Sequence, residues 1–301
     1  MNVVAAPNLK TALGTCALLA CAVALVAAGA RAQDKGKAAS GFAEVNGTRL
    51  WYETAGKGST VVLVHGGLVD SRLWDDQMKE LSKRHRVVRY DLRGYGKSAA
   101  PTADFSPVED LRALLAFLRV ERATVVGLSL GGIIAADFAL EHPRMTEGLV
   151  LVGAGLRGDK QPPDPKSMEA YRASVREGAE KFAEMALESP LFAGVKEKPR
   201  AHARLREMLL DNAKALQHLF ANRLKYPEPE TINRLGNISA PTLVVVGDRD
   251  GPNLLNIADT LHAKIPGARK SIIRDASHHP PVETPEEFNR VLLDFLRRPR
   301  N

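Results

Sequence analysis

A serine between glycines is the residue of this sequence best suited to chemistry. Ser129 lies at the centre of Gly127-Leu128-Ser129-Leu130-Gly131, a G-x-S-x-G pattern. An apolar run precedes the pentapeptide and small residues follow it, so we expect a sharp strand-to-helix turn that presents the serine hydroxyl above a sheet. The flanking glycines would avoid the steric clash of such a turn. The pattern predicts a nucleophile, and a buried serine in a glycine-rich turn is the alternative.

Two later loops offer the acid and the base that a serine nucleophile needs. One apolar run leads to Asp248-Arg249-Asp250, and another leads to Ser277-His278-His279. Groups that follow parallel strands gather at one edge of the sheet. The chain order of serine, aspartate and histidine is typical of one hydrolase fold. From these residues alone, either aspartate could be the acid and either histidine the base.

The elements that must position these residues alternate between two kinds. Short runs rich in valine, isoleucine and leucine predict strands at 60–64, 86–90, 123–126, 148–152, 242–246 and 269–273. Segments with helical periodicity lie at 71–83, 107–118 and 132–141. This alternation predicts an α/β fold with a mostly parallel sheet and helices on both faces. Ahead of these segments, Asn46-Gly47 predicts a hairpin at one edge.

The interval 156–240 breaks the alternation. It opens with proline- and glycine-rich residues and continues as charged amphipathic segments around 168–188 and 201–220. The interval is several times longer than one crossover requires. We expect a helical cap over the active site, inserted between core segments 40–155 and 241–301. Ordinary helices that cover the sheet are the alternative.

Residues 1–32 have the composition of a secretory signal peptide. An alanine-rich apolar run follows Lys10, and Ala30-Arg31-Ala32 offers small residues for cleavage. The alternatives are a retained membrane anchor, for which the apolar part is short, and a lipoprotein signal at Cys21. We expect cleavage after Ala32 and export to the periplasm or the medium of a bacterium. Because Cys16 and Cys21 lie within the signal, the mature protein would contain no cysteine.

The composition argues against several function classes. The chain has 301 residues and is 45% hydrophobic, which is sufficient for a large core. Its formal net charge of +7 would fall to +5 if cleavage of the signal peptide removed Lys10 and Arg31. The basic residues are scattered among acidic ones. This scatter argues against nucleic-acid binding. No metal-ligand spacing, phosphate loop or dinucleotide fingerprint is found. We therefore predict no metal, no cofactor and no stable membrane association after cleavage, and nothing in the sequence indicates an oligomeric state.

Five segments in order resemble the α/β-hydrolase superfamily over nearly all of the mature chain. They are the strand and HG turn at 61–67, the D-x-R-G-x-G-x-S loop at 91–98, the nucleophile elbow at 127–132, the acid loop at 246–250 and the histidine loop at 277–285. The resemblance implies Ser129 as nucleophile, Asp250 as acid and His278 as base. It favours His278 because the family's histidine lies five residues before the glutamate that Glu283 matches. Ser277 departs from the glycine common before that histidine.

The resemblance also implies an oxyanion hole made by the backbone amides of Gly67 and Leu130. It makes His65 a structural residue that holds the turn by hydrogen bonds. The other histidines have no chemical partners in the sequence and are expected at the surface or at helix ends: His85, His142, His202, His218 and His262.

The implied activity is cofactor-free hydrolysis of a small-molecule carboxylic ester or lactone, in the capped, esterase- and lactonase-like branch. Ser129 would form an acyl-enzyme, His278 would move the protons and Asp250 would hold its tautomer. A serine at the elbow argues against the dehalogenase and epoxide-hydrolase branches, which carry a carboxylate there. The same layout is similar to C–C bond hydrolases and cofactor-free perhydrolases, and a non-enzymatic ligand receptor is a further alternative. Substrate identity and acyl preference depend on the cap and do not follow from the sequence.

Overall fold

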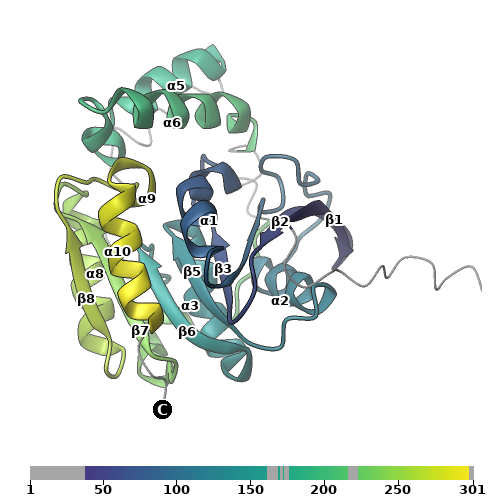
Figure 1. Ribbon diagram of the computed structural model, residues 1–301. Coiled ribbons are helices and arrows are strands. Elements are labelled where there is room, and N and C mark those ends of the chain that lie inside the picture. The colour runs from purple at the N-terminus through teal and green to yellow at the C-terminus, as the bar shows by residue number, and fades with distance from the viewer. Residues whose placement is uncertain (1–37, 161–168, 170–171, 173–175, 216–222, 298–301) are drawn as a thin grey trace, which may run out of the picture. The chain divides into compact units, whose positions relative to one another are not determined.

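One sheet of eight strands runs through the structure, a computed structural model of the chain (Figure 1). Its spatial order is β1-β2-β4-β3-β5-β6-β7-β8. The strands are β1 (Ala39–Val45), β2 (Thr48–Ala55), β3 (Thr60–Val64), β4 (Arg86–Tyr90), β5 (Ala123–Leu128), β6 (Thr146–Val152), β7 (Thr242–Gly247) and β8 (Arg269–Ile273). All pairs from β4 onward are parallel, whereas β2 is antiparallel to β1 and to β4. Asn46 and Gly47 turn the opening hairpin with φ of 46° and 68°, as a primed two-residue turn requires.

Helices cover both faces of this sheet. They are α1 (Asp75–Leu81), α2 (Pro107–Phe117), α3 (Leu130–Glu141), α8 (Pro252–Lys264), α9 (Pro280–Glu283) and α10 (Pro285–Arg297), with a 3-10 turn, η1 (Ser71–Trp74), before α1. Val62 and Val64 of β3 share an apolar cluster with α2, α3 and α8. Val61 and Leu63 share the other with α1 and α10. Because successive strand residues face opposite ways, these uniformly apolar strands are buried on both sides. The predicted α/β-hydrolase fold is confirmed.

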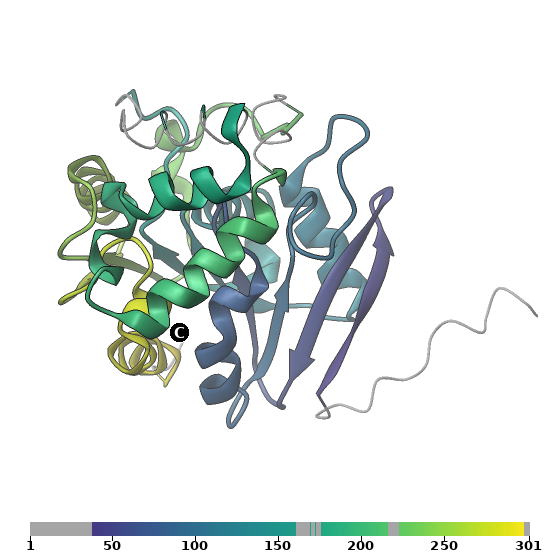
Figure 2. The same cartoon turned by 90° about the horizontal axis from the view of Figure 1, so that it is seen from above.

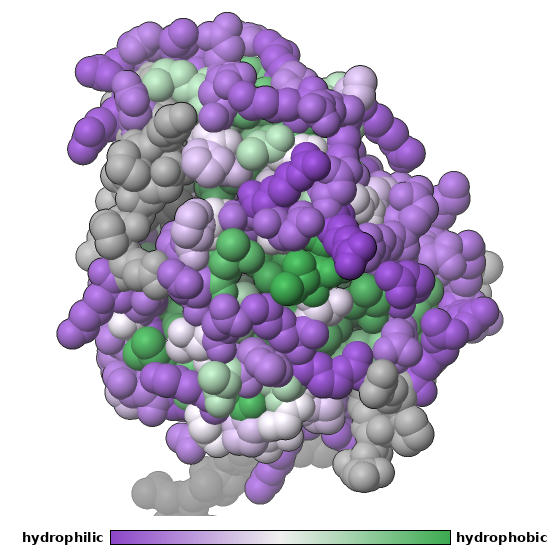
Figure 3. Space-filling view, turned by 90° about the vertical axis from the view of Figure 1, so that its left-hand side faces the viewer, coloured by the Kyte–Doolittle hydropathy of each residue, from purple (hydrophilic) through white to green (hydrophobic). Residues whose placement is uncertain are grey.

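The described part of the interval between β6 and β7 is helical. It contains α5 (Ala179–Leu187), η3 (Pro190–Val195), α6 (Pro199–Asn212), η4 (Thr231–Asn233) and η5 (Leu235–Asn237). In two perpendicular views, α5 and α6 lie across the end of the core that carries α9 (Figures 1 and 2). The segment η3 contacts the predicted histidine loop, where the amide of Gly194 donates to Ser277 Oγ at 3.0 Å. On the face toward β8, hydrophobic surface gathers below the mostly hydrophilic α5 and α6 region (Figure 3).

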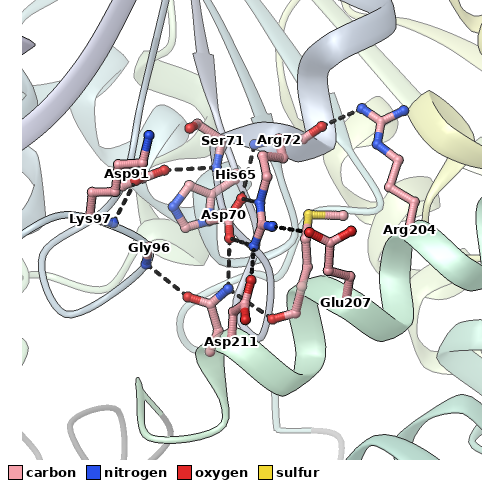
Figure 4. Close-up of polar contacts among 12 residues, drawn as sticks. His65, Asp70, Ser71, Arg72, Asp91, Gly96, Lys97, Arg204, Glu207 and Asp211 are labelled. Atoms are coloured by element: carbon pink, nitrogen blue, oxygen red, sulfur yellow. Dashed lines mark hydrogen bonds and ion pairs between the residues drawn. The ribbon is translucent and has the colours of Figure 1, made fainter. Parts of the chain in front are cut away.

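The C-terminal end of α6 is fixed to the core by a buried polar network (Figure 4). Asn212 Nδ2 donates to Asp70 Oδ2 at 2.8 Å, and its Oδ1 accepts from the amide of Gly96 at 2.8 Å. Arg72 pairs with both Asp70 and Asp211 at 2.7 Å. Burial raises the pKa of Asp70, but the hydrogen bonds from Arg72 and Asn212 outweigh it and hold that pKa below its ordinary value. The carboxylate therefore stays ionised as the centre of the network.

The structure describes residues 38–160, 169, 172, 176–215 and 223–297. Within these ranges, no helix has the length and apolar character needed to cross a membrane. The predicted signal peptide at 1–32 lies outside the described residues, as do parts of the predicted helical segments at 168–188 and 201–220. Export and cleavage after Ala32 stay predictions.

Candidate active site

Ser129 stands at the corner between β5 and α3 in a strained backbone conformation. Its φ of 54° and ψ of −113° lie in a backbone region that residues other than glycine rarely adopt. The amide of Ser129 donates to the Val152 carbonyl at 3.0 Å, which ties the corner to the end of β6. A Cβ on Gly131 would lie 2.2 Å from the Val64 carbonyl oxygen, and one on Gly127 would lie 2.1 Å from that of Gly131. The two glycines are therefore required by close backbone contact.

The loops after β7 and β8 bring Asp250 and His278 together. Asp250 Oδ2 lies 3.1 Å from His278 Nδ1, and both side chains are buried. Asp250 Oδ1 also accepts from the amide of Gly251 at 2.8 Å, which fixes the carboxylate. An ionised carboxylate can only accept, so Nδ1 carries the imidazole proton and Nε2 is left as the acceptor. This is the tautomer that a general base toward a serine hydroxyl requires.

The neighbouring aspartate and histidine are used elsewhere. Asp248 is exposed, and its Oδ1 accepts from the amide of Ala276 at 3.3 Å. The ring of His279 is buried and stacks on Phe192 of η3, with ring centroids 4.6 Å apart. The geometry thus pairs Asp250 with His278 and leaves the other two residues in structural contacts.

Gly153, which the sequence analysis did not single out, joins this pair to the serine corner. It follows the Val152 carbonyl that holds Ser129, and a Cβ on it would lie 3.0 Å from His278 Nδ1 and 3.1 Å from Asp250 Oδ2. Its φ of 46° also favours glycine. The only sequence signal was a glycine directly after the apolar run of β6. The acid–base pair and Ser129 therefore both lie next to the end of β6.

The HG turn after β3 packs against the serine corner. A Cβ on Gly66 would lie 3.2 Å from Ser129 Cβ, and one on Gly67 would lie 4.0 Å from Leu130 Cδ2. Leu130 is the first residue of α3, where amides lack a partner within the helix. Across the described ranges, no protein acceptor is bonded to the amide of Gly67. The two predicted oxyanion donors thus lie near each other and near Ser129.

His65 holds this turn through both ring nitrogens. Its Nε2 accepts from the amide of Leu92 at 2.9 Å, so Nδ1 carries the proton and donates to the Gly66 carbonyl at 2.7 Å. Burial lowers the pKa of His65, which keeps the ring neutral for this pair of bonds. The structural role predicted for His65 agrees with these contacts.

Comparison with known protein families gives a match over most of the chain. A family model described as the alpha/beta hydrolase family matches residues 61–291. The chain belongs to the alpha/beta hydrolase family.

Several relatives of this hydrolase are similar over most of its length. A 2-hydroxy-6-oxononadienedioate/2-hydroxy-6-oxononatrienedioate hydrolase of Paraburkholderia xenovorans is 30% identical, with 82% of this chain and 90% of the relative covered. Among solved structures, a thermophilic esterase from Thermogutta terrifontis is 27% identical with a TM-score of 0.75, covering 87% of this chain and 100% of that one. An enol-lactonase from Burkholderia xenovorans is 27% identical with a TM-score of 0.73, covering 86% and 100%.

Other relatives match only in part. Uncharacterized proteins of Mycobacterium tuberculosis and Mycobacterium bovis are 39% identical over 117 residues, so the chain covers about a third of their length (34%) and they cover 38% of it. The longer matches bear the names of hydrolytic enzymes.

The histidine loop of this hydrolase is organised by a buried carboxylate. Glu283 of α9 accepts from the amides of Ser277 and His279 at 2.6 and 2.7 Å and from Ser277 Oγ at 2.9 Å. Burial raises the pKa of Glu283, although these hydrogen bonds oppose the rise. Ser277 Oγ also accepts from the amide of Gly194 in η3. Ser277, which stands where the family commonly has glycine, therefore connects the histidine loop to the interval after β6.

Of the other predicted histidines, the structure describes all but His218. His142 Nε2 is hydrogen-bonded to Glu109 Oε1 at 3.1 Å, and His85 Nδ1 is hydrogen-bonded to Ser59 Oγ at 2.9 Å. Within the part of the chain that the structure describes, no three His, Cys, Asp or Glu residues are grouped so that they could hold a metal ion.

The buried His279 should make the stability of this hydrolase depend on pH. Burial, together with the neighbouring His278, holds the pKa of His279 well below the ordinary value of about 6.5. As the pH falls below about 6.5, the unfolded chain gains a proton that the folded chain does not, so the free energy of unfolding decreases. We expect His279→Gln to reduce this decrease, measured as urea unfolding midpoints between pH 7.5 and 5. His262→Gln, at an exposed position of α8, should keep the wild-type dependence. Equal slopes in the two variants would contradict this assignment.

Proposed function

We propose that this protein hydrolyses a carboxylic ester or lactone of a small molecule through an acyl-enzyme on Ser129. The observation that carries the proposal is the buried Asp250–His278 pair, 3.1 Å apart, beside Gly153 at the end of β6, whose preceding residue Val152 accepts the amide hydrogen bond of Ser129. This pairing leaves His278 Nε2 as a proton acceptor, whereas a structural histidine such as His65 has both ring nitrogens bonded to the protein.

In the proposed reaction, Ser129 Oγ attacks the carbonyl carbon of the substrate while His278 Nε2 takes the hydroxyl proton. The carbonyl oxygen becomes an oxyanion, to which the amides of Gly67 and Leu130 donate. When the tetrahedral intermediate collapses, the bond to the alkoxy oxygen breaks and His278 returns the proton to it. A water molecule, deprotonated by His278, then releases the acid by the same two steps. Asp250 stabilises the imidazolium that forms in each half-reaction.

The similar proteins support the choice of bond. An esterase and an enol-lactonase share the fold over the whole of their chains, and both names describe cleavage at an acyl carbon. The hydrolase of 2-hydroxy-6-oxononadienedioate favours, as a second candidate, cleavage of a C–C bond next to a carbonyl group. All three reactions pass through an oxyanion, so the same donors would serve each of them.

The test combines a substrate panel with active-site labelling of the purified protein. The panel contains p-nitrophenyl esters graded by acyl length, a set of lactones and a 2-hydroxy-6-oxo-dienoate. A fluorophosphonate probe then reports a reactive serine, which peptide mass mapping locates. We expect ester or lactone turnover and a single adduct on Ser129. Turnover of the dienoate alone would replace the ester reaction by C–C cleavage. No turnover and no adduct would overturn the proposal in favour of a ligand receptor.

A further inference from the structure

A buried tyrosine hydroxyl near the candidate oxyanion turn has no role in the reaction as proposed above. Tyr95 belongs to the D-x-R-G-x-G-x-S loop after β4 and is 5% exposed. Its hydroxyl is fully buried, and no protein group of the described ranges forms a hydrogen bond with it. Leaving a buried hydroxyl without a partner costs about 1–3 kcal/mol. Such a group therefore suggests that its partner is a ligand.

The position of this hydroxyl indicates which ligand atom it would meet. It lies 3.7 Å from the point that a Cβ on Gly67 would occupy, and Leu130 Cδ2 lies 4.0 Å from the same point. The hydroxyl thus lies on the side of Gly67 where a side chain would project, near the turn that carries one predicted oxyanion donor and near the residue that carries the other.

The loop that carries Tyr95 is tied to the same turn. The amide of Tyr95 donates to the Leu92 carbonyl at 2.9 Å, and the amide of Leu92 donates to His65 Nε2 at 2.9 Å. The Tyr95 ring meets the His65 ring edge to face, with centroids 5.3 Å apart and an interplanar angle of 73°. These contacts hold the hydroxyl in place before substrate binds, which is the condition under which a donor lowers an activation barrier most.

Tyr95 keeps its proton, and so can donate a hydrogen bond, at physiological pH. Burial raises the pKa of the phenol far above its ordinary range, and the nearby Tyr226 hydroxyl adds to the rise. The hydroxyl therefore keeps its proton throughout the reaction. It can strengthen a hydrogen bond to an oxygen that becomes negative, but it cannot serve as a base or a nucleophile.

We propose that the Tyr95 hydroxyl is a third donor to the oxyanion, beside the amides of Gly67 and Leu130. The inference rests on the proposed acyl-transfer function. As the carbonyl double bond becomes a single bond, its electron pair moves to the oxygen, and the Tyr95 O–H donates to that charge without transferring its proton. Because the charge is greatest in the transition state, the hydroxyl lowers the barrier more than it improves substrate binding.

Tyr95→Phe tests the proposal because it removes only the hydroxyl. We expect kcat to fall by up to about 100-fold while KM stays within about twofold. Affinity for a trifluoromethyl ketone, which forms a charged tetrahedral adduct with the serine, should fall by a similar factor. The melting temperature should be equal to or above that of the wild type, since an unpartnered buried hydroxyl is lost.

Tyr90→Phe is the matched control. Tyr90 is the other tyrosine whose buried hydroxyl lacks a partner among the described residues; burial raises its pKa, and Asp110 of α2 adds to the rise. Its variant should retain wild-type kcat and inhibitor affinity. The proposal is overturned if Tyr95→Phe keeps the wild-type kcat, or if it raises KM at constant kcat, which would indicate a ground-state binding contact. If wild-type protein neither turns over the panel nor binds the fluorophosphonate, the proposed function fails and the third donor fails with it.

Discussion

Ser129→Ala is expected to lower kcat by about 10⁶-fold on any ester that the wild-type protein hydrolyses. The substitution removes the oxygen that forms the acyl-enzyme, and His278 then has no nucleophile to deprotonate. Binding and the oxyanion donors remain, so a small residual rate over that in water should persist. The measurement is the initial rate at saturating substrate, together with loss of the fluorophosphonate adduct. Ser40→Ala, at an exposed position of β1, should behave as wild type.

Ser129→Gly separates chemistry from strain at the same position. It also lacks the hydroxyl, so its activity should match that of Ser129→Ala. Glycine adopts φ of 54° without the penalty that a Cβ imposes there, which is about 1–3 kcal/mol. The greater chain entropy of unfolded glycine offsets part of this gain, about 0.5–1 kcal/mol. We expect the free energy of unfolding of Ser129→Gly to exceed that of Ser129→Ala. Substantial activity in either variant would exclude Ser129 as the nucleophile.

Asp250→Asn is expected to lower kcat by about 10⁴-fold. An asparagine can direct its NH₂ group at His278 Nδ1, which would make Nδ1 the acceptor and place the proton on Nε2. The imidazole would then face Ser129 as a donor and could not act as a base. The carboxylate that stabilises the imidazolium would also be lost. Steady-state kinetics at pH 7.5 on the best ester of the panel provide the measurement.

Asp248→Asn is the control for this substitution because it lies two residues away. Its side chain is exposed and accepts a hydrogen bond from the backbone amide of Ala276, from which an asparagine oxygen can still accept. We expect its kcat to stay within about threefold of wild type. The reverse ranking of the two variants would show that Asp248 orients the base and that the buried pair has a structural role.

The central strands were predictable from sequence because they are buried on both faces. The observed β3, β4 and β8 have the predicted bounds, although only β3 is a nearly continuous apolar run, whereas β4 and β8 mix charged and apolar residues. Helix details were less predictable. The segment predicted at 71–83 divides into η1 and α1. The segment predicted from 201 begins at Pro199, because the first turn of a helix tolerates proline. At these two positions the helix ends are determined by local backbone preferences and not by the periodic spacing of apolar residues.

The residues at the ends of the strands were found by motif, but their surroundings were not. Gly153 and Tyr95 contact the site through elements that are distant in sequence from Ser129 and His278. A glycine after a strand and a tyrosine in a glycine-rich loop are common, so neither had a local pattern that could distinguish it. Their significance depends on the sheet order, which places β6 beside β5 and the loop after β4 beside the HG turn.

The attachment of α6 has a consequence for how molecules reach the site. Near its middle, Arg204 pairs with Asp76 at 2.7 Å, and at its end Asn212 bonds to both Asp70 and Gly96. Swinging α6 outward would break the Arg204–Asp76 pair and the bonds of Asn212, and it would leave the buried carboxylate of Asp70 with one donor fewer. We infer that substrate enters and product leaves while α6 stays in place. Access to Ser129 would then not depend on an outward movement of α6.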